Sequence, residues 1–250
     1  MKIITSSNNE KIKQIRSLSD KKARCKHSLF VVEGVNLVGD MPKGFAKELY
    51  IKESRLDALM PIAEKLEIEP TVVSDFIFDK ISDTVSSSGI LAIAELPEKK
   101  PITSRVVMVL DRISDAGNMG TIIRTGVAMG VTDYIAIDSV DAYSPKVVRS
   151  TMGGIFSANI VPFSYAGACD ALNNYKVAIL DMGGQNVFDY QPELPLALVV
   201  GNEAHGVSAE LRERADVVLA IPMYGNIESL NAGVSASVVV ATIADKLNKK

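Results

Sequence analysis

Residues 198–206 read Leu-Val-Val-Gly-Asn-Glu-Ala-His-Gly, an apolar run that ends abruptly in a polar loop with glycines. The same change from apolar to polar residues occurs within Ile221–Asn231 and, much earlier, after Val106–Leu110. In open α/β sheets, ligands bind at the carboxyl ends of strands, where loops supply polar atoms and helix N-termini supply free N–H groups. The three stretches therefore predict one ligand site at the end of a sheet.

Apolar strands and helices alternate through the second half of the chain. The expected strands are 106–110, 134–137, 158–161, 177–180, 196–200 and 217–221, and the expected helices are 118–129, 145–152, 166–174, 209–215 and 230–247. Nearly continuous apolar strands separated by helices are typical of a parallel sheet that is covered on both faces. The pattern predicts a doubly wound α/β domain.

A smaller α/β unit precedes this domain. Its expected elements are a helix over 9–19, a strand over 28–34, a helix over 36–41, a strand over 48–51, a helix over 55–66, a strand over 71–73, a further element over 75–81 and a strand over 89–94. The polar segment Pro97–Pro101 is bracketed by prolines, as linkers often are. We therefore expect two domains, residues 1–97 and residues 103–250.

The composition is that of a soluble globular protein, with 47% hydrophobic and 23% charged residues. The first ten residues contain no apolar segment of the signal-peptide kind, and the apolar stretch Val238–Ala244 is too short to span a bilayer. We expect a cytoplasmic protein with no membrane partner. Two cysteines and two histidines support neither a disulfide framework nor a metal cluster, so we expect no metal.

The charge of the chain is unevenly distributed. The net charge is −3, yet residues 1–26 hold eight lysines and arginines against two acidic residues. A localised basic segment of this kind is suited to binding phosphates, whatever the total charge. A basic helix that is merely solvated would explain the same charges equally well.

Three short motifs follow the strand ends in order: Asn118-x-Gly120 with Arg124 four residues on, Gly201-x-Glu203-x-x-Gly206, and Ile221-Pro222-Met223 leading to Glu228-Ser229-Leu230-Asn231. In this combination the chain resembles the SpoU (TrmH-type) ribose 2′-O-methyltransferases of the SPOUT class, over roughly residues 105 to 247. Periodicity alone would indicate a Rossmann-like fold, whereas the resemblance implies a deep C-terminal trefoil knot. It also implies S-adenosylmethionine-dependent 2′-O-methylation of an RNA ribose, and a homodimer.

Glycines at strand ends allow the backbone to approach an adenine closely enough to read its edge. The resemblance assigns the methyl-donor pocket to Leu180, Gly183, Gly201, Asn202, Ile221, Met223 and Leu230. A plain turn would also explain the glycines at 183 and 184. A dinucleotide or ATP site is disfavoured, because no strand is followed by Gly-x-Gly-x-x-Gly and no phosphate-loop lysine is present.

The resemblance assigns catalysis to Asn118, Arg124, Glu203, Ser229 and Asn231. Within the resemblance, Arg124 is assigned the activation of the ribose 2′-hydroxyl. Because a guanidinium stays protonated in proteins, holding a phosphate and stabilising the developing alkoxide suits Arg124 better than acting as a literal base, and the sequence leaves both roles open. Each residue also has a structural explanation. Arg124 could be a surface residue of its helix, and the asparagines and Ser229 could cap helices. Glu203 would be costly to bury without a partner, and the resemblance has it positioning Arg124 or its own loop.

The first domain resembles the small, ribosomal-protein-like RNA-binding domain that many SpoU enzymes carry. In that reading the residues near the RNA are Lys22, Arg24, Lys26, Phe30 and Glu33, although an aromatic such as Phe30 is more often a core residue. This domain favours large-subunit ribosomal RNA as the substrate. The alternatives are a transfer-RNA ribose methyltransferase and a non-catalytic RNA-binding or ribosome-binding protein of the same fold. The presence of all the motif residues argues against the non-catalytic alternative.

Overall fold

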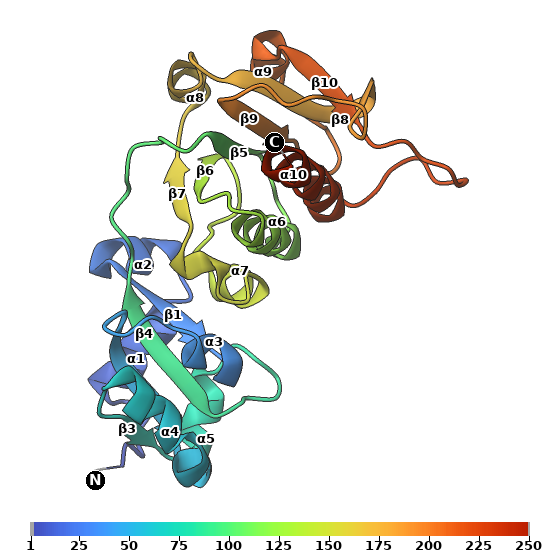
Figure 1. Ribbon diagram of the computed structural model, residues 1–250. Coiled ribbons are helices and arrows are strands. Elements are labelled where there is room, and N and C mark those ends of the chain that lie inside the picture. The colour runs from blue at the N-terminus through green and yellow to red at the C-terminus, as the bar shows by residue number, and fades with distance from the viewer. Residues whose placement is uncertain (1–2, 250) are drawn as a thin grey trace. The chain divides into compact units, whose positions relative to one another are not determined.

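The computed structural model describes residues 3–249, which form two compact units (Figure 1). The first unit contains the residues up to Pro97 together with Tyr143–Phe156. The second unit contains Glu98–Ala142 and the chain from Ser157 onward. A short segment in the second half of the sequence thus packs with the first unit. Among the described residues, no helix is both long and apolar enough to cross a membrane.

The first unit is built on a mixed four-stranded sheet. In spatial order its strands are β1 (Leu29–Glu33), β4 (Ile90–Glu95), β2 (Ala46–Lys52) and β3 (Thr71–Val73). Strand β4 is antiparallel to both neighbours, and β3 is parallel to β2. The helical elements of this unit are α1 (Glu10–Ser17), α2 (Lys21–His27), α3 (Val35–Gly39), η1 (Glu53–Arg55), α4 (Leu56–Leu66), α5 (Asp75–Ile81), α7 (Pro145–Ser150) and η2 (Gly154–Phe156).

Most of these elements lie where the apolar pattern predicted them. The stripe of α1 is buried through Ile12 and Ile15, and with Leu18 it packs into a core that includes Val31 of β1 and Tyr50 of β2. Helix α2 was not predicted, because it has no apolar stripe.

Helix α2 is stabilised at its ends. Asp20 caps its N-terminus, accepting hydrogen bonds from the N–H groups of Lys22 and Ala23. Ser28 ends it in the left-handed conformation, with a φ of 54°. The one buried side chain of this helix is that of Arg24.

The second unit is built on a six-stranded sheet in which every pair of neighbours is parallel. In spatial order its strands are β10 (Val217–Ala220), β8 (Lys176–Asn186), β9 (Leu196–Val200), β5 (Val106–Asp111), β6 (Asp133–Ile137) and β7 (Asn159–Pro162). The predicted parallel sheet is confirmed.

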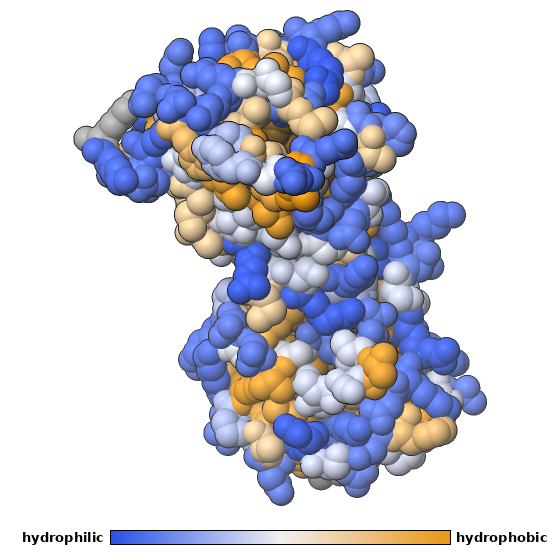
Figure 2. Space-filling model, turned by 90° about the vertical axis from the view of Figure 1, so that its right-hand side faces the viewer, coloured by the Kyte–Doolittle hydropathy of each residue, from blue (hydrophilic) through white to orange (hydrophobic). Residues whose placement is uncertain are grey.

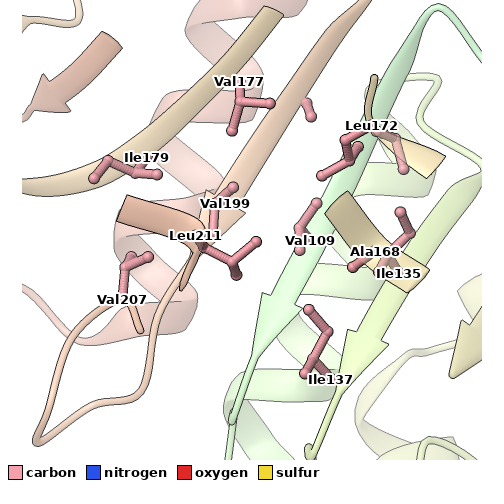
Figure 3. Packing of buried hydrophobic residues seen from close by; sticks show 12 residues of the cluster. Val109, Ile135, Ile137, Ala168, Leu172, Val177, Ile179, Val199, Val207 and Leu211 are labelled. Carbon is pink, nitrogen blue, oxygen red and sulfur yellow. The ribbon is translucent and has the colours of Figure 1, made fainter. Parts of the chain in front are cut away.

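Helices cover both faces of this sheet (Figure 1). On one face α8 (Tyr165–Ala171) and α9 (Ala209–Arg214) pack on alternate strand residues such as Val109, Ile135 and Val199 (Figure 3). On the other face α6 (Ala116–Ala128) and α10 (Ala232–Asn248) pack against each other. Because successive side chains of a strand point to opposite faces, strands buried on both sides must be apolar throughout. The doubly wound α/β class is confirmed.

The start of α6 corrects one prediction. The helix begins at Ala116, and its N-cap is Asp115, whose carboxylate accepts a hydrogen bond of 2.8 Å from the N–H of Asn118. Asn118 therefore lies inside the first turn and is not the cap. This position leaves its side-chain amide available for contacts outside the helix.

Candidate active site

A cavity of about 830 Å³ lies in the second unit, beside β8, β9 and β10 and the loops that follow β9 and β10. All seven residues predicted to bind the cofactor line it, namely Leu180, Gly183, Gly201, Asn202, Ile221, Met223 and Leu230. Three of the predicted catalytic residues, Glu203, Ser229 and Asn231, line it as well. The cavity therefore joins parts of the chain that are far apart in sequence, from Leu180 to Ser235.

One wall of the cavity comes from an irregularity in β8. Val218 of β10 pairs with Ile179, but its neighbour Leu219 pairs with Gln185, so residues 180–184 bulge out of the ladder. Gly183 adopts a φ of 78°, which favours glycine. A Cβ atom on Gly184 would lie 2.5 Å from the carbonyl oxygen of Val218. The two glycines are thus part of a bulge next to the cavity rather than a plain turn.

A second wall is the loop after β9. Backbone hydrogen bonds of 3.0 and 2.9 Å join Asn202 to Gly206 in both directions and close the loop. A Cβ atom on Gly201 would lie 2.3 Å from the carbonyl carbon of Gly206 and 2.4 Å from the backbone nitrogen of Val207. Such contacts are sterically impossible without moving the backbone, so this position requires glycine.

Glu203 connects this loop to the start of α6. Its carboxylate accepts hydrogen bonds from the side-chain amide of Asn118, at 2.7 Å, and from the hydroxyl of Ser114, at 3.0 Å. Partial burial acts to raise the pKa of Glu203, but hydrogen bonds, chiefly that from Asn118, outweigh it and lower the pKa below its usual value. Glu203 is therefore held as a carboxylate. Its partners include Asn118 and Ser114 but not Arg124.

The third motif meets the first at the N-terminus of α10. Asn231 caps this helix, and its side-chain oxygen accepts hydrogen bonds from the N–H groups of Gly233, at 2.9 Å, and Val234, at 3.2 Å. Gly233 packs so closely on α6 that a Cβ atom there would lie 3.2 Å from the Cα of Asn118. The first turns of α6 and α10 are therefore in contact beside the cavity.

Arg124 is separate from this group within one chain. Its side chain is exposed on α6 and does not line the cavity. Its guanidinium makes no hydrogen bond or ion pair with any other residue in the range 3–249. The guanidinium of Arg124 is thus not bonded to Asn118, Glu203, Ser229 or Asn231 within one chain.

The sequence analysis did not identify Asp111, although this residue ends the apolar run of β5. Its carboxylate is fully buried and accepts hydrogen bonds from the N–H of Ser208, at 2.6 Å, and from the hydroxyl of Tyr165, at 2.9 Å. Because a buried carboxylate is costly without partners, these bonds fix the N-terminus of α9 to the end of β5. The position of an aspartate directly at the end of an apolar strand was the sequence signal that could have identified Asp111 as a structural anchor.

The five residues predicted to lie near RNA fall into two groups. Lys22 and Lys26 are exposed on α2, whereas Arg24, Phe30 and Glu33 are each at most 3% exposed. The guanidinium of Arg24 donates to the carbonyl oxygens of Leu18, at 2.7 Å, and Ser19, at 2.8 Å. The guanidinium of Arg24 therefore binds backbone carbonyl groups inside the first unit.

Phe30 and Glu33 are buried for different reasons. The ring of Phe30 makes edge contacts with Tyr143 and Phe45, at centroid distances of 5.1 and 6.4 Å, which agrees with a core role. The carboxylate of Glu33 accepts hydrogen bonds from the hydroxyl of Ser82 and, at 3.0 Å, from the N–H of Asp83. Both side chains are therefore buried in the first unit, and their place near RNA stays a prediction.

The cavity fits S-adenosylmethionine in size and in chemistry. Its volume lies within the range of about 300–1,000 Å³ typical of small-molecule sites. Apolar side chains such as Leu180, Ile221 and Leu230 line it together with Gly201, which has no side chain of its own. This combination suits an adenine that is read by backbone groups between apolar walls. No group of acidic, histidine or cysteine side chains suited to a metal ion occurs within residues 3–249.

Comparison with known families gives two matches. Residues 105–241 match the SpoU rRNA Methylase family, and residues 9–92 match the MRM3-like substrate binding domain. A relative in Bacillus subtilis, the 23S rRNA (guanosine(2553)-2′-O)-methyltransferase RlmP, is 35% identical over 96% of this chain and 98% of its own length. The 23S rRNA (uridine(2479)-2′-O)-methyltransferase of Streptomyces viridochromogenes is 32% identical over 74% of this chain and 63% of its own.

Solved structures give the same picture. The AdoMet-bound rRNA methyltransferase from Sinorhizobium meliloti is 26% identical and superimposes with a TM-score of 0.84, with 98% of each chain covered. A TrmH-family RNA methyltransferase from Porphyromonas gingivalis is 27% identical and gives a TM-score of 0.80 over 94% of this chain and 97% of its own. The predicted enzyme class and methyl donor are confirmed by these findings. The chain belongs to the SpoU rRNA Methylase family.

Proposed function

We propose that the protein transfers the methyl group of S-adenosylmethionine to a ribose 2′-hydroxyl of large-subunit ribosomal RNA. The observation that carries this proposal is the convergence of the loops after β9 and β10 with the bulge of β8 on a single cavity. The names of the relatives in Bacillus subtilis and Streptomyces viridochromogenes support 23S ribosomal RNA as the substrate class.

The cavity residues would hold the cofactor, which supplies an electrophilic methyl group when bound. The loop after β9 is kept in place by Glu203, through its bonds to Ser114 and Asn118. Ser229 and Asn231 place a hydroxyl and an amide on the same cavity, where they would orient the cofactor or the ribose. In-line transfer to an oxygen depends on proximity and charge stabilisation, so the proposed reaction needs no metal.

Arg124 would stabilise the alkoxide that develops on the ribose and hold the neighbouring phosphate. Since its guanidinium lies outside the cavity of its own chain, we propose a homodimer in which Arg124 of one protomer faces the cavity of the other. Apolar side chains are exposed on the face of the molecule in Figure 2. The exposed large apolar side chains of the second unit include Val234 of α10, at 45% exposure, and Met129 after α6, at 39%, which suits an interface beside these helices.

We assign substrate binding to residues 1–97 and methyl transfer to residues 103–250, with the knot that the family resemblance implies. The match of residues 9–92 to a substrate binding domain supports the first assignment. The exposed Lys22 and Lys26 of α2 would contact RNA phosphates. An enzyme of ribosomal RNA with these relatives would work in the cytoplasm.

Mapping of ribose methylation in total RNA, from cells with and without the protein, tests the substrate. Loss of one methyl group from 23S ribosomal RNA is the expected result. Loss from a transfer RNA would instead favour the transfer-RNA alternative. A protein that neither binds the cofactor nor changes any methylation would be a non-catalytic RNA-binding protein.

The variant Arg124→Ala tests the mechanism. We expect cofactor affinity to stay within about threefold of wild type while methyl transfer falls by roughly 100-fold or more, as on removal of a preorganised charge. Calorimetry gives the affinity, and transfer from labelled cofactor gives the rate. If affinity and activity fell together, Arg124 would be a cofactor-binding residue and the assignment would be wrong.

A further inference from the structure

The loop between β10 and α10 has a tip that does not form part of the cavity wall. Residues 221–223 and 228–231 line the cavity, whereas residues 224–227 between them do not. Figure 1 shows this loop projecting from the second unit. Because both ends of the loop belong to the wall, the tip residues Tyr224, Gly225, Asn226 and Ile227 lie at the rim of the cavity.

The tip is exposed and is not bonded to the rest of its chain. Tyr224 is 92% exposed and Ile227 is 60% exposed. Within the described range 3–249, no hydrogen bond involves any of residues 224–227. Single exposed apolar side chains are common on protein surfaces, so the position of Tyr224 beside the cavity is what gives it significance.

The proposed reaction brings a nucleotide to this rim. The ribose 2′-hydroxyl must reach the methyl group of the cofactor, and the base is joined to the same ribose. Proteins that recognise single-stranded RNA commonly stack its bases on aromatic side chains. Among residues 3–249, no phenylalanine, tyrosine or tryptophan lines the cavity itself. Tyr224, which directly follows the lining residue Met223, is the aromatic residue beside it.

The composition of the loop favours a base over a phosphate as the group that it binds. Residues 222–230 contain no lysine or arginine and include one acidic residue, Glu228. Phosphates are bound chiefly by lysine and arginine, so this loop is poorly suited to the RNA backbone. The ring of Tyr224 instead offers a face on which any base can stack. Ile227 adds a second apolar surface at the same tip.

We propose that the ring of Tyr224 stacks on the base of the target nucleotide, a role that rests on the proposed function. The base is then held at the rim while the ribose presents its 2′-hydroxyl to the cavity. Tyr224 binds the substrate and takes no part in moving a proton. The residues assigned above to the methyl transfer keep their tasks.

A second copy of the chain is the competing occupant, because tyrosine is also enriched in protein interfaces. The proposed reaction requires a nucleotide at the rim, whereas it requires no protein segment there. RNA is therefore the occupant that the position of Tyr224 favours. The experiment must separate the two.

The chain contains no tryptophan, which makes a direct readout simple. In the Tyr224→Trp variant, every tryptophan signal comes from the tip of the loop. We expect its fluorescence to be quenched by 23S ribosomal RNA purified from cells that lack the protein, because a stacked base quenches an indole. Phe188→Trp, at a position that is 45% exposed and does not line the cavity, is the control for absorption of light by the RNA.

The same variant reports on a second copy. If another protomer covered the tip, the emission of Tyr224→Trp would shift to shorter wavelength as the protein concentration rises, without any RNA. Such a shift, with no more quenching by RNA than in Phe188→Trp, would overturn the proposal.

The kinetic test uses single turnovers on the same ribosomal RNA, at RNA concentrations below saturation. We expect Tyr224→Ala to transfer methyl groups roughly 10-fold more slowly than wild type or worse, in line with the usual contribution of base–aromatic stacking. Tyr224→Phe keeps the ring and should stay within about threefold of wild type. The affinity of both variants for S-adenosylmethionine, from calorimetry, should be unchanged within about threefold.

Two kinetic outcomes would overturn the assignment. One is a rate for Tyr224→Ala equal to that of Tyr224→Phe. The other is a loss of cofactor affinity in parallel with the rate, which would show that the tip supports the cavity wall instead of the base. Failure of the proposed function is distinguishable from both, because wild type would then methylate no ribosomal RNA.

Discussion

The loop after β9 and the segment from α2 to β1 are held in place by different kinds of contact. In the loop, backbone meets backbone, since Asn202 and Gly206 exchange hydrogen bonds and Gly201 lies against the carbonyl carbon of Gly206. In the α2–β1 segment, large side chains are buried, as the guanidinium of Arg24 and the ring of Phe30 show. Substitutions in the loop should therefore act through steric fit, and those in the segment through lost side-chain partners.

The largest effect is expected for Gly201→Ala. The added Cβ would lie 2.3–2.6 Å from three backbone atoms of Gly206 and Val207, which cannot give way without moving the cavity wall. We expect cofactor affinity, measured by calorimetry, to fall by roughly 100-fold, at the upper end of the usual cost of overpacking. Gly225→Ala is the matched control, because a Cβ there meets nothing within 4 Å. Equal affinities in the two variants would contradict the steric argument.

A smaller effect is expected for Arg24→Met, which keeps an apolar stem and removes the guanidinium. The carbonyl oxygens of Leu18 and Ser19 would lose their donor inside the first unit. We expect the free energy of unfolding, from urea titration, to fall by about 1–2 kcal/mol. Lys26→Met, at an exposed position of the same helix, should change it by less than about 0.5 kcal/mol. A reversed order would show that Arg24 does not hold this segment together.

The same two regions show what the sequence could predict. That the loops after β9 and β10 share one site follows from apolar runs that stop, because the strands of a parallel sheet end at the same edge. The individual cavity residues came from the family resemblance. The contacts and burial of single polar side chains cannot be predicted from this pattern. Asp115 and Asn118 are both good caps, and three-dimensional context decided between them. Eight basic residues near the N-terminus predicted a phosphate-binding surface, but charge alone could not reveal that Arg24 is buried.

Distance in sequence hid two further features. Residues 143–156 pack with the first unit although they follow β6 of the second, and no local pattern reports such a return of the chain. The bulge of β8 was predicted as a strand end at Leu180, because the ladder resumes only at Gln185. Both features depend on contacts between residues far apart in the chain, which apolar periodicity does not contain.

The smallest effect is expected for Glu203→Gln. In the loop after β9, this side chain adds its hydrogen bonds to those that the backbone makes. Hydrogen bonds, chiefly from Asn118, outweigh partial burial and lower the pKa of Glu203 below 4.5. A carboxyl whose pKa is lowered by folding stabilises the folded state above its unfolded pKa, and this contribution is lost as the pH falls through the folded pKa.

We therefore expect the Tm of wild type to exceed that of Glu203→Gln by about 0.3–2 °C. This difference should stay constant between pH 8 and about pH 5. Below pH 4.5 the difference should close, since the carboxyl becomes neutral like the amide. Glu210→Gln, at an exposed position at the start of α9, is the control and should match wild type throughout. A difference that widened with acid would mean that Glu203 is protonated in the native loop, and that the loop is held by its backbone contacts alone.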